Sequence, residues 1–484
     1  MAKAKPDSSR RRQKMKAAPD TTSQRAARRS HGRSLRPKCP RSSHSKMGSR
    51  PSERDPLSLI EKSNEGRAKH LLPIRFTRML ESPFAFFRGT AVIQAHDLKG
   101  TPSAGIIVQS CGDCHLANFG VFASPERTLI FDINDFDETL PAPFEWDVKR
   151  LASSFVLASR WRNFRKKEGH RTSRAVVTAY REQMAAFAGM HTLDRWYAHV
   201  TVGDLIERFG SDQEVRKTLV QAVDTALKHT SEAGLHRMTR DVKGRPRIMD
   251  HPPLMYHLDP SERDWKRDVV PFFEAYKATL SLDRQVLFDR FQLVDAVFKV
   301  VGIGSVGTQC FVTLWMADID DPLFLQVKQA LPSALEGVAG SSAYENNGER
   351  VVVGQRIMQS ASDIFLGWTR SPHGDDFYVR QLRDQKISID LGTASERVLL
   401  TYATLCGQTL ARAHAKSGKA SEISGYLGSR SNFDDAITEY AVGYADRVAK
   451  DYDAFRAAAR AGRFPTEASS SKMKKQSDRP KAKT

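Results

Sequence analysis

The sequence predicts an α+β fold with two lobes, a larger helical lobe and a smaller β-rich lobe, between two disordered basic tails. Apolar residues recur at helical spacing from about residue 145 onward, as in Val148, Leu151 and Phe155. Around residues 296–328 the pattern changes to short β-type segments about a glycine turn. Helical patterns then return, so the β-rich lobe is expected as a late insertion in the chain.

The two tails carry the whole excess of positive charge. The formal net charge is +19, of which residues 1–50 supply +14 and residues 461–484 supply +5, so residues 51–460 sum to zero. Both ends are rich in Ser, Pro, Lys and Arg, so we expect residues 1–54 and 461–484 to be disordered. Such tails either stay solvated without a fixed partner or make weak contacts to nucleic acid or an anionic surface.

Composition excludes several classes of protein. Hydrophobic residues make up 40% of the 484 residues, which is enough for a sizeable core. No apolar run is long enough for a transmembrane segment, and the N-terminus lacks the apolar part of a secretory signal. Five cysteines at sparse, uneven spacing do not form a disulfide framework. We therefore expect a cytoplasmic protein.

The helical lobe is expected over residues 55–290. Its predicted elements, in order, are a helix through Phe76 and Leu80 that breaks at Pro83, strands at 104–110 and 128–133, a helix from Glu145, a mostly helical stretch at 175–235 and a proline-rich irregular connection at 240–262.

The β-rich lobe is expected over residues 291–392. Its predicted strands flank the glycine turn within 296–316, end at Lys328, and recur at 350–354 and 376–382. Helices at 395–416 and 433–460 close the fold, and residues 393–460 are expected to pack on the helical lobe.

The first motif with chemical meaning is Gly112-Asp113-Cys114-His115-Leu116-Ala117-Asn118, followed on the next predicted strand by Asp132. Phosphoryl transfer needs a carboxylate that orients the accepting hydroxyl, and oxygen ligands that hold Mg²⁺ against the phosphates. Protein kinases supply an Asp, then an Asn in the same loop, then an Asp on the next strand. Asp113 is therefore the predicted base, and Asn118 and Asp132 are predicted metal ligands. A plain polar turn between two strands uses the same residue types.

The second motif is Gly302-Ile303-Gly304-Ser305-Val306-Gly307. A glycine-rich turn of this type is weak evidence by itself, because dinucleotide-binding folds use it as well. Here a β-type segment follows it, and Lys328 ends the next strand. Kinases cover the phosphates of ATP with this arrangement: a strand, a glycine turn, a second strand and then a strand that carries a lysine. The predicted nucleotide-binding residues are Gly302, Gly304, Ser305, Gly307 and Lys328. The alternative interpretation of the same segment is a hairpin turn and a surface lysine.

Each motif is half of a kinase-like site, and the halves occur in reversed order. A circular permutation explains this order, because the helix at 395–416 is the one that normally leads directly into the catalytic loop. The sequence thus predicts a two-lobed protein-kinase-like fold, circularly permuted, that binds ATP and Mg²⁺. The nearest analogy is with kinases that phosphorylate aminoglycosides.

Several acidic residues are candidates for supporting roles. Glu336 is a candidate to pair with Lys328, and Asp135 and Asp137 either serve the metal or sit on an exposed turn. Asp147 resembles an Asp that braces the catalytic loop in antibiotic-phosphorylating kinases. Arg88, in an apolar setting, requires a carboxylate or phosphate partner.

The predicted reaction is transfer of a phosphoryl group to a hydroxyl of an unknown small molecule or protein. A non-catalytic nucleotide-binding module, a metal-dependent phosphoesterase and a nucleotidyl (AMP) transferase are the alternatives. Cys111 and Cys114 form a single CxxC pair, which is too few ligands for a structural zinc site and leaves a redox role open.

Long segments of the chain resemble a bacterial family known as domain of unknown function 2252. They include SPFAFFRGTA, CGDCHLANFG, FDINDFDETLPAPFEWDVKRLASS, VVGIGSVGT, LFLQVKQALPSALE and LARAHAKSG, and the similarity extends over roughly residues 55–460. The family has no established activity, so the resemblance implies common descent but no substrate. Lys419 occupies a position where the family tends to have an acid.

Overall fold

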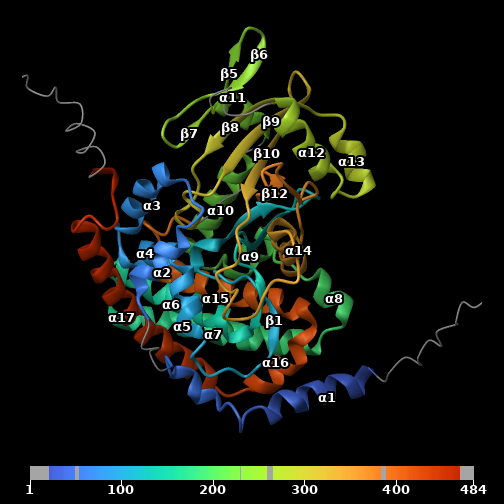
Figure 1. Cartoon of the computed structure of the whole chain (residues 1–484). Helices are drawn as coiled ribbons and strands as arrows, with labels where there is room; N and C mark the ends of the chain where they lie inside the picture. The colour runs from blue at the N-terminus through green and yellow to red at the C-terminus, as the bar shows by residue number, and fades with distance from the viewer. Residues whose placement is uncertain (1–20, 49–53, 229–230, 259–264, 383–388, 469–484) are drawn as a thin grey trace, which may run out of the picture.

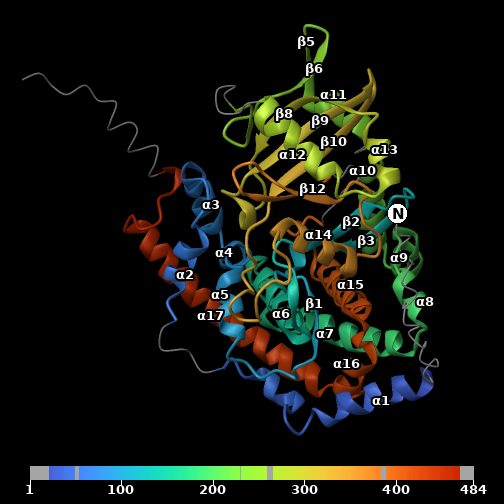
Figure 2. The same cartoon turned by 45° about the vertical axis from the view of Figure 1, so that its right-hand side comes forward.

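The computed structural model describes residues 21–48, 54–228, 231–258, 265–382 and 389–468. It has an α+β architecture in which the largest sheet lies at one end and the long helices lie at the other (Figures 1 and 2). The outer parts of the predicted tails, residues 1–20 and 469–484, lie outside the described residues. Within the described ranges, no helix combines the length and the apolar character needed to cross a membrane.

One antiparallel sheet of six strands, in the order β11–β12–β10–β9–β8–β7, forms the strand-rich end. Its members are β7 (Met255–Tyr256), β8 (Gln292–Lys299), β9 (Cys310–Asp318), β10 (Asp321–Gln329), β11 (Gly367–Arg370) and β12 (Asp376–Gln381). Since side chains alternate along a strand, Lys328 and Val327 on β10 lie on opposite faces. The face of Val327 packs on an aromatic core from α12 (Val270–Lys277) and α13 (Leu282–Phe288). The other face packs in part on α11 (Ser231–Met238), and Lys328 on this face pairs with Asp137 in the segment after β3.

The helical end is a bundle around one large apolar core. Its main helices are α6 (Phe144–Trp161), α7 (Lys166–Gly189), α15 (Glu396–His414), α16 (Ala420–Leu427) and α17 (Asn432–Arg460). Helix α6 is buried from Phe144 to Ser159, including the charged residues Asp147, Lys149 and Arg150. Charged groups that deep in a protein require partners. Asp147 and Arg150 find theirs in the loop after β1, at Cys111 and Asp113.

Short elements connect the bundle to the sheet. They are α2 (Pro56–Ser63), α3 (Leu72–Met79), α4 (Pro83–Gly89), α5 (Ala91–Leu98), β1 (Ile107–Ser110), β2 (Phe119–Ala123), β3 (Leu129–Ile133), β4 (Leu140–Pro143), α8 (Thr192–Tyr197), α9 (Val202–Phe209), α10 (Gln213–Leu227), β5 (Thr239–Val242), β6 (Arg245–Ile248) and α14 (Asn347–Met358). Strand β2 pairs with β3, and β1 pairs with β4, as separate two-stranded ladders.

The predicted strand at 350–354 is wrong, because these residues lie inside helix α14. The run of three valines favours a strand by local propensity. Asn346 caps the helix, accepting hydrogen bonds from the backbone N–H groups of Gly348 and Glu349, and packing of α14 on β11 and β12 outweighs the propensity. Strands β5, β6 and β7 lie where the sequence suggested an irregular connection.

The prediction that residues 1–54 are disordered does not hold for residues 21–48. They form α1 (Thr21–Ser34) and the 3₁₀ turn η1 (Arg41–Ser45), and α1 runs along α16 in both views (Figures 1 and 2). Arg36 donates to the carbonyl oxygens of Gly425 and Tyr426, and Arg41 donates to that of Leu427. These arginines therefore satisfy the carbonyl end of α16, where cations are favourable.

Candidate functional site

A cavity of about 300 Å³ opens where the Lys328 face of the sheet meets the helical end. Residues from both motifs line it, together with neighbours from β10 and β12: Arg88, Asp113, His115, Ala117, Asn118, Asp135, Val301, Gly302, Ile303, Gly304, Ser305, Gln326, Lys328, Arg380 and Leu382. Most of the predicted site residues are thus brought together although they lie far apart in the sequence. Asp132, Gly307 and Glu336 do not line this cavity.

The loop that carries Asp113 follows β1 and is fixed from behind by Asp147 of α6. The Asp147 carboxylate accepts hydrogen bonds from the backbone N–H groups of Cys111 at 2.8 Å and Gly112 at 3.1 Å. His414 at the end of α15 lies 3.1 Å from the same carboxylate. Burial opposes ionisation of Asp147, but His414 and the backbone donors hold its pKa below the ordinary value.

Gly112 is required by this turn. It has φ of 76°, a region that disfavours other residues, and a Cβ there would lie 2.1 Å from the carbonyl oxygen of Glu138. The loop therefore lies tightly against the segment that follows β3.

Asp113 is oriented by Arg150 of α6. The Arg150 Nε atom donates to Oδ1 of Asp113 at 2.5 Å, while its other nitrogens donate to Gln94 and to the carbonyl of Phe87. His115 Nε2 lies 3.8 Å from Oδ2 of Asp113. Burial lowers the pKa of His115 to about 4, so this imidazole is neutral near pH 7. The Asp113 carboxylate is thus held at the cavity wall with part of its surface exposed.

Asn118 and Asp135 form an oxygen-rich corner of the cavity. Asn118 donates its side-chain amide to the backbone oxygen of Asp113 at 2.8 Å, which leaves its Oδ1 atom as the acceptor end. Asp135 accepts from the N–H of Asp137 at 3.2 Å. Burial alone would raise the pKa of Asp135, but the charges of Lys328 and Arg380 hold it below the ordinary value. A carboxylate and an amide oxygen fit Mg²⁺, which prefers hard oxygen ligands.

Asp132 differs from the predicted metal ligand. It is fully buried behind the cavity and accepts hydrogen bonds from Arg412 at 2.6 Å, from both Ser360 donors at 2.6 and 2.8 Å, and from its neighbour Ile133. Its oxygens are therefore used to tie β3 to α15 and to the end of α14. The apolar neighbours Phe131 and Ile133 indicate burial of Asp132, but the sequence interpretation gave more weight to its spacing from Asn118.

The glycine turn is held by arginines that the sequence interpretation did not identify. Arg78 donates to the carbonyl oxygen of Val301, Arg75 to those of Ile303 and Gly304, and Arg67 to that of Val306, at 2.7–2.9 Å. We call Arg67, Arg75 and Arg78 the arginine clamp. The sequence signal was the spacing of Arg75 and Arg78 by one helical turn in an otherwise apolar segment.

The clamp determines which backbone groups remain for a ligand. In a planar trans peptide the N–H of the next residue points away from the carbonyl oxygen. With the carbonyls of Val301 and Ile303 held on the clamp side, the N–H groups of Gly302 and Gly304 are directed to the other side, and both glycines line the cavity. Gly307, with φ of 92°, packs against Arg67 and serves the turn's conformation.

Lys328 is buried on β10 and pairs with Asp137 rather than with Glu336. Asp137 also accepts hydrogen bonds from Tyr378 at 2.7 Å and from Ser305 at 3.1 Å. Although burial opposes its charge, Asp135 and Asp137 raise the pKa of Lys328 well above the ordinary value. Glu336 accepts from the N–H of Ser333 at 3.1 Å and lies in an adjoining cavity. Asp137 therefore occupies the role that the sequence interpretation gave to Glu336.

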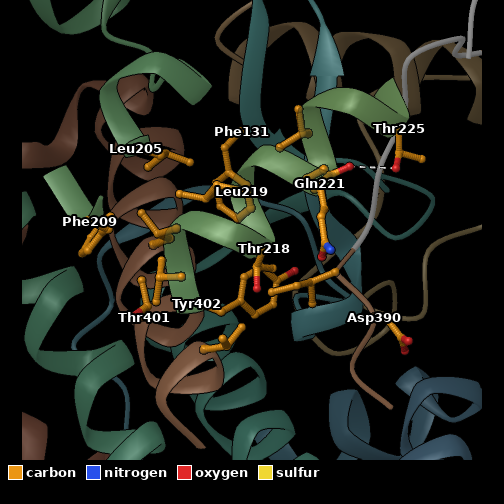
Figure 3. A pocket seen from close by; sticks show the side chains of 17 residues that line it. Phe131, Leu205, Phe209, Thr218, Leu219, Gln221, Thr225, Asp390, Thr401 and Tyr402 are labelled. Carbon is orange, nitrogen blue, oxygen red and sulfur yellow. Dashed lines mark hydrogen bonds between the residues drawn. The ribbon is translucent and has the colours of Figure 1, made fainter. Parts of the chain in front are cut away.

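A second, mostly apolar cavity of about 320 Å³ lies between α9, α10 and α15, on the far side of the β2–β3 ladder. Figure 3 shows Phe131, Leu205, Leu219 and Tyr402 converging on it. Tyr402 donates its hydroxyl to the carbonyl oxygens of Leu116 and Phe119, at the two ends of the turn that carries Asn118. This cavity contains none of the predicted site residues, but Tyr402 in its wall supports the loop that carries Asp113 and Asn118.

The cysteine pair lies beside this loop. Cys111, Cys114 and Asp147 place one ligand atom each within 4.8 Å of one another, and all three are buried. Burial raises the pKa of both thiols, which disfavours the thiolate that metal binding or redox chemistry needs. Asp147 is already occupied by backbone donors and His414, so the three residues are best explained as structural.

A family model described as an uncharacterized protein conserved in bacteria, DUF2252, matches residues 67–458. The chain belongs to the DUF2252 family. Every residue that lines the cavity at the two motifs lies within that match. No curated protein and no solved structure matched the chain. DUF2252 membership therefore confirms the predicted relationship, and the chemistry has to be argued from the cavity itself.

Proposed function

We propose that this chain is an ATP- and Mg²⁺-dependent phosphotransferase with a circularly permuted kinase-like fold. The proposal depends on one observation, the single cavity with Asp113, Asn118 and Asp135 on one wall and the glycine turn with Lys328 on the other. Each wall supplies what phosphoryl transfer requires, a base with oxygen ligands and a set of N–H and cationic phosphate contacts. The adjoining cavity shares Asp113, Asp135 and Gly304, but its lining contains neither Lys328 nor Asn118.

The path of the chain around the loop supports the permutation. Ser417, just after α15, accepts a hydrogen bond from the N–H of Gln109 on β1 at 3.0 Å. His414 at the end of α15 contacts Asp147, which in turn holds the loop after β1. The end of α15 is therefore spatially adjacent to the start of β1, as expected if an unpermuted chain ran directly from one to the other.

In the proposed reaction, the acceptor hydroxyl gives its proton to Asp113 while its oxygen bonds to the γ-phosphorus of ATP. The bond from the γ-phosphorus to the β–γ bridging oxygen breaks, and ADP leaves. Lys328 and the N–H groups of the glycine turn stabilise negative charge on the phosphates. Asn118 and Asp135 would hold Mg²⁺, which when bound neutralises phosphate charge and orients the phosphates.

Nucleotide binding and product analysis test the proposal. The full chain should show a Mg²⁺-dependent rise in unfolding temperature with ATP, because a ligand specific for the folded state stabilises it. Phosphorus NMR of the reaction should show ADP as product with a suitable acceptor, whereas AMP would indicate nucleotidyl transfer. Lys328→Met should remove the ATP-induced shift, and Asp113→Asn should keep the shift while abolishing turnover. A parent protein that ATP and Mg²⁺ leave unchanged would contradict the proposal.

A further inference from the structure

Arg88, the last side chain of helix α4, is a half-buried cation that forms no ion pair with any described residue. Its Nε atom is buried and has no hydrogen-bond partner, and its guanidinium makes no ion pair within the described parts of the chain. Its guanidinium lies over the ring of Phe84, 5.7 Å from the ring centre. A structural ion pair, the simpler explanation for this residue, is therefore not present among those residues. Burying a guanidinium is costly unless an oxyanion meets it.

Two cavities meet at Arg88. The cavity with Lys328 has a volume of about 300 Å³, and the adjoining one has about 540 Å³. Five residues line both, and we call them the junction residues: Arg88, Asp113, Asp135, Gly304 and Ser305. The predicted base, a predicted metal ligand and part of the glycine turn are thus at the passage between the chambers, and Arg88 is the cation among them.

Four other cations near the passage already have acceptors. Lys328 pairs with Asp137, and Arg150 pairs with Asp113. Arg67 and Arg75 donate to carbonyl oxygens of the glycine turn. Arg88 is the cation at the junction whose donors remain available for a ligand.

The walls of the two chambers differ. The smaller chamber ends in Gln326, Lys328 and Arg380 of the sheet. The larger chamber has no residue of the six-stranded sheet in its lining. It is enclosed by polar residues of α2 and the turn after it, of α5, and of the segments after β3 and β10, among them Lys62, Glu65, His96, Glu138, Ser333 and Glu336. A nucleotide covered by the glycine turn and Lys328 fills the smaller chamber, which leaves the larger one for an acceptor.

We propose that Arg88 contacts the phosphoryl group during its transfer, and that the larger chamber binds a polar, hydroxyl-bearing acceptor. This inference rests on the proposed phosphotransferase function. The acceptor hydroxyl enters from the larger chamber, loses its proton to Asp113 and bonds to the γ-phosphorus, while ADP departs into the smaller chamber. Arg88 donates two parallel hydrogen bonds to phosphoryl oxygens, the geometry for which a guanidinium is suited. Its guanidinium stabilises the negative charge that develops on the phosphoryl oxygens during transfer, and it transfers no proton.

Calorimetric titration of the full-length protein with Mg·ATP and Mg·ADP tests the role of Arg88. In Arg88→Gln, the preference for ATP over ADP should fall by about tenfold or more, with ADP affinity within about twofold of the parent, because only the γ-phosphoryl contact is lost. Phosphoryl turnover, with water or an added polyol as acceptor, should fall by about 10³-fold, the scale of an arginine that acts on the transferred group. Arg160→Gln, which removes the same charge from the exposed end of α6, should change neither quantity.

Arg88→Lys keeps the charge and guards against a folding defect in Arg88→Gln. It should retain the parent's unfolding temperature and ADP affinity while losing most of the ATP preference, because an ammonium cannot make the paired contact. If Arg88→Gln or Arg88→Lys binds ATP with the parent's preference and turns over at the parent's rate, the role of Arg88 is refuted while the phosphotransferase stands. If the parent binds no Mg·ATP, the phosphotransferase itself is refuted, and the inference with it.

Discussion

Two neighbouring aspartates, Asp132 and Asp135, should respond in opposite ways to the same isosteric change. Asp132 is fully buried, and its oxygens accept hydrogen bonds from Arg412 and from both donors of Ser360. Asp135 lines the cavity and accepts one backbone hydrogen bond, from Asp137. The first side chain therefore serves the fold, and the second is available to a metal.

The magnitudes follow from these contacts. Asp132→Asn leaves the guanidinium of Arg412 buried without its counterion and places an amide donor against other donors. Breaking a buried ion pair from one side costs about 3–5 kcal/mol, so the free energy of unfolding should fall by that amount. Asp135→Asn keeps an oxygen for the N–H of Asp137, and Lys328 keeps its partner Asp137, so the loss should stay below about 1.5 kcal/mol.

Urea unfolding followed by tryptophan fluorescence, with and without Mg·ATP, measures both effects. Asp132→Asn should unfold at a clearly lower urea concentration and should keep its response to Mg·ATP under conditions where it is folded. Asp135→Asn should unfold near the parent's midpoint and lose the Mg²⁺-dependent part of that response. Equal midpoints for the two variants, or loss of the Mg²⁺ response in Asp132→Asn alone, would refute this division of roles.

Two further changes probe the scaffold of the site, and a third probes the buried His44 beside α16. Asp147→Asn should lower the free energy of unfolding by about 1–3 kcal/mol in urea titration, because the backbone donors of Cys111 and Gly112 lose a charged acceptor; an unchanged midpoint would argue against the brace. Arg75→Met removes three hydrogen bonds to backbone carbonyls, so hydrogen exchange should become faster in the glycine turn, and stability should fall by about 2–4 kcal/mol; unaltered exchange there would contradict the clamp. Burial lowers the pKa of His44 to about 3, so below pH 6.5 the unfolded chain takes up a proton that the folded chain does not bind. The stability that neutral His44 provides is therefore complete above pH 6.5 and is lost as the pH falls toward 3. The free energy of unfolding should be lower by about 1.4 kcal/mol at pH 5.5 than at neutral pH. Urea titrations at pH 7.5 and 5.5 should show a smaller pH dependence for His44→Gln.

The sequence was sufficient for those parts of the site that depend on local spacing. The loop from Asp113 to Asn118 and the glycine turn were identified because the chemistry requires particular residue types at short intervals, and one cavity contains them. The limits of some helices also follow from the apolar periodicity, as for the start at Glu145 and the range 433–460 against the observed α6 and α17.

Contacts between distant segments could not be read from spacing. The pairing of Lys328 with Asp137, and the hold of Arg75 on the glycine turn, join parts of the chain separated by 191 and 228 positions. Asp132 looked like a ligand because a buried carboxylate and a catalytic one are the same residue type. The contacts of Arg412 and Ser360, both more than two hundred residues later, distinguish them.

The N-terminal segment that closes α16 has a consequence for where this protein can be cut. The family match begins at residue 67, yet Arg36 and Arg41 occupy the carbonyl end of a helix deep in the bundle, and His44 contributes a buried hydrogen bond to Tyr426 at 2.7 Å. A fragment limited to the family match, residues 67–458, would lose those donors and expose the apolar surface beneath them. The part of the chain that folds cooperatively therefore starts before residue 67 and includes the segment with Arg36, Arg41 and His44.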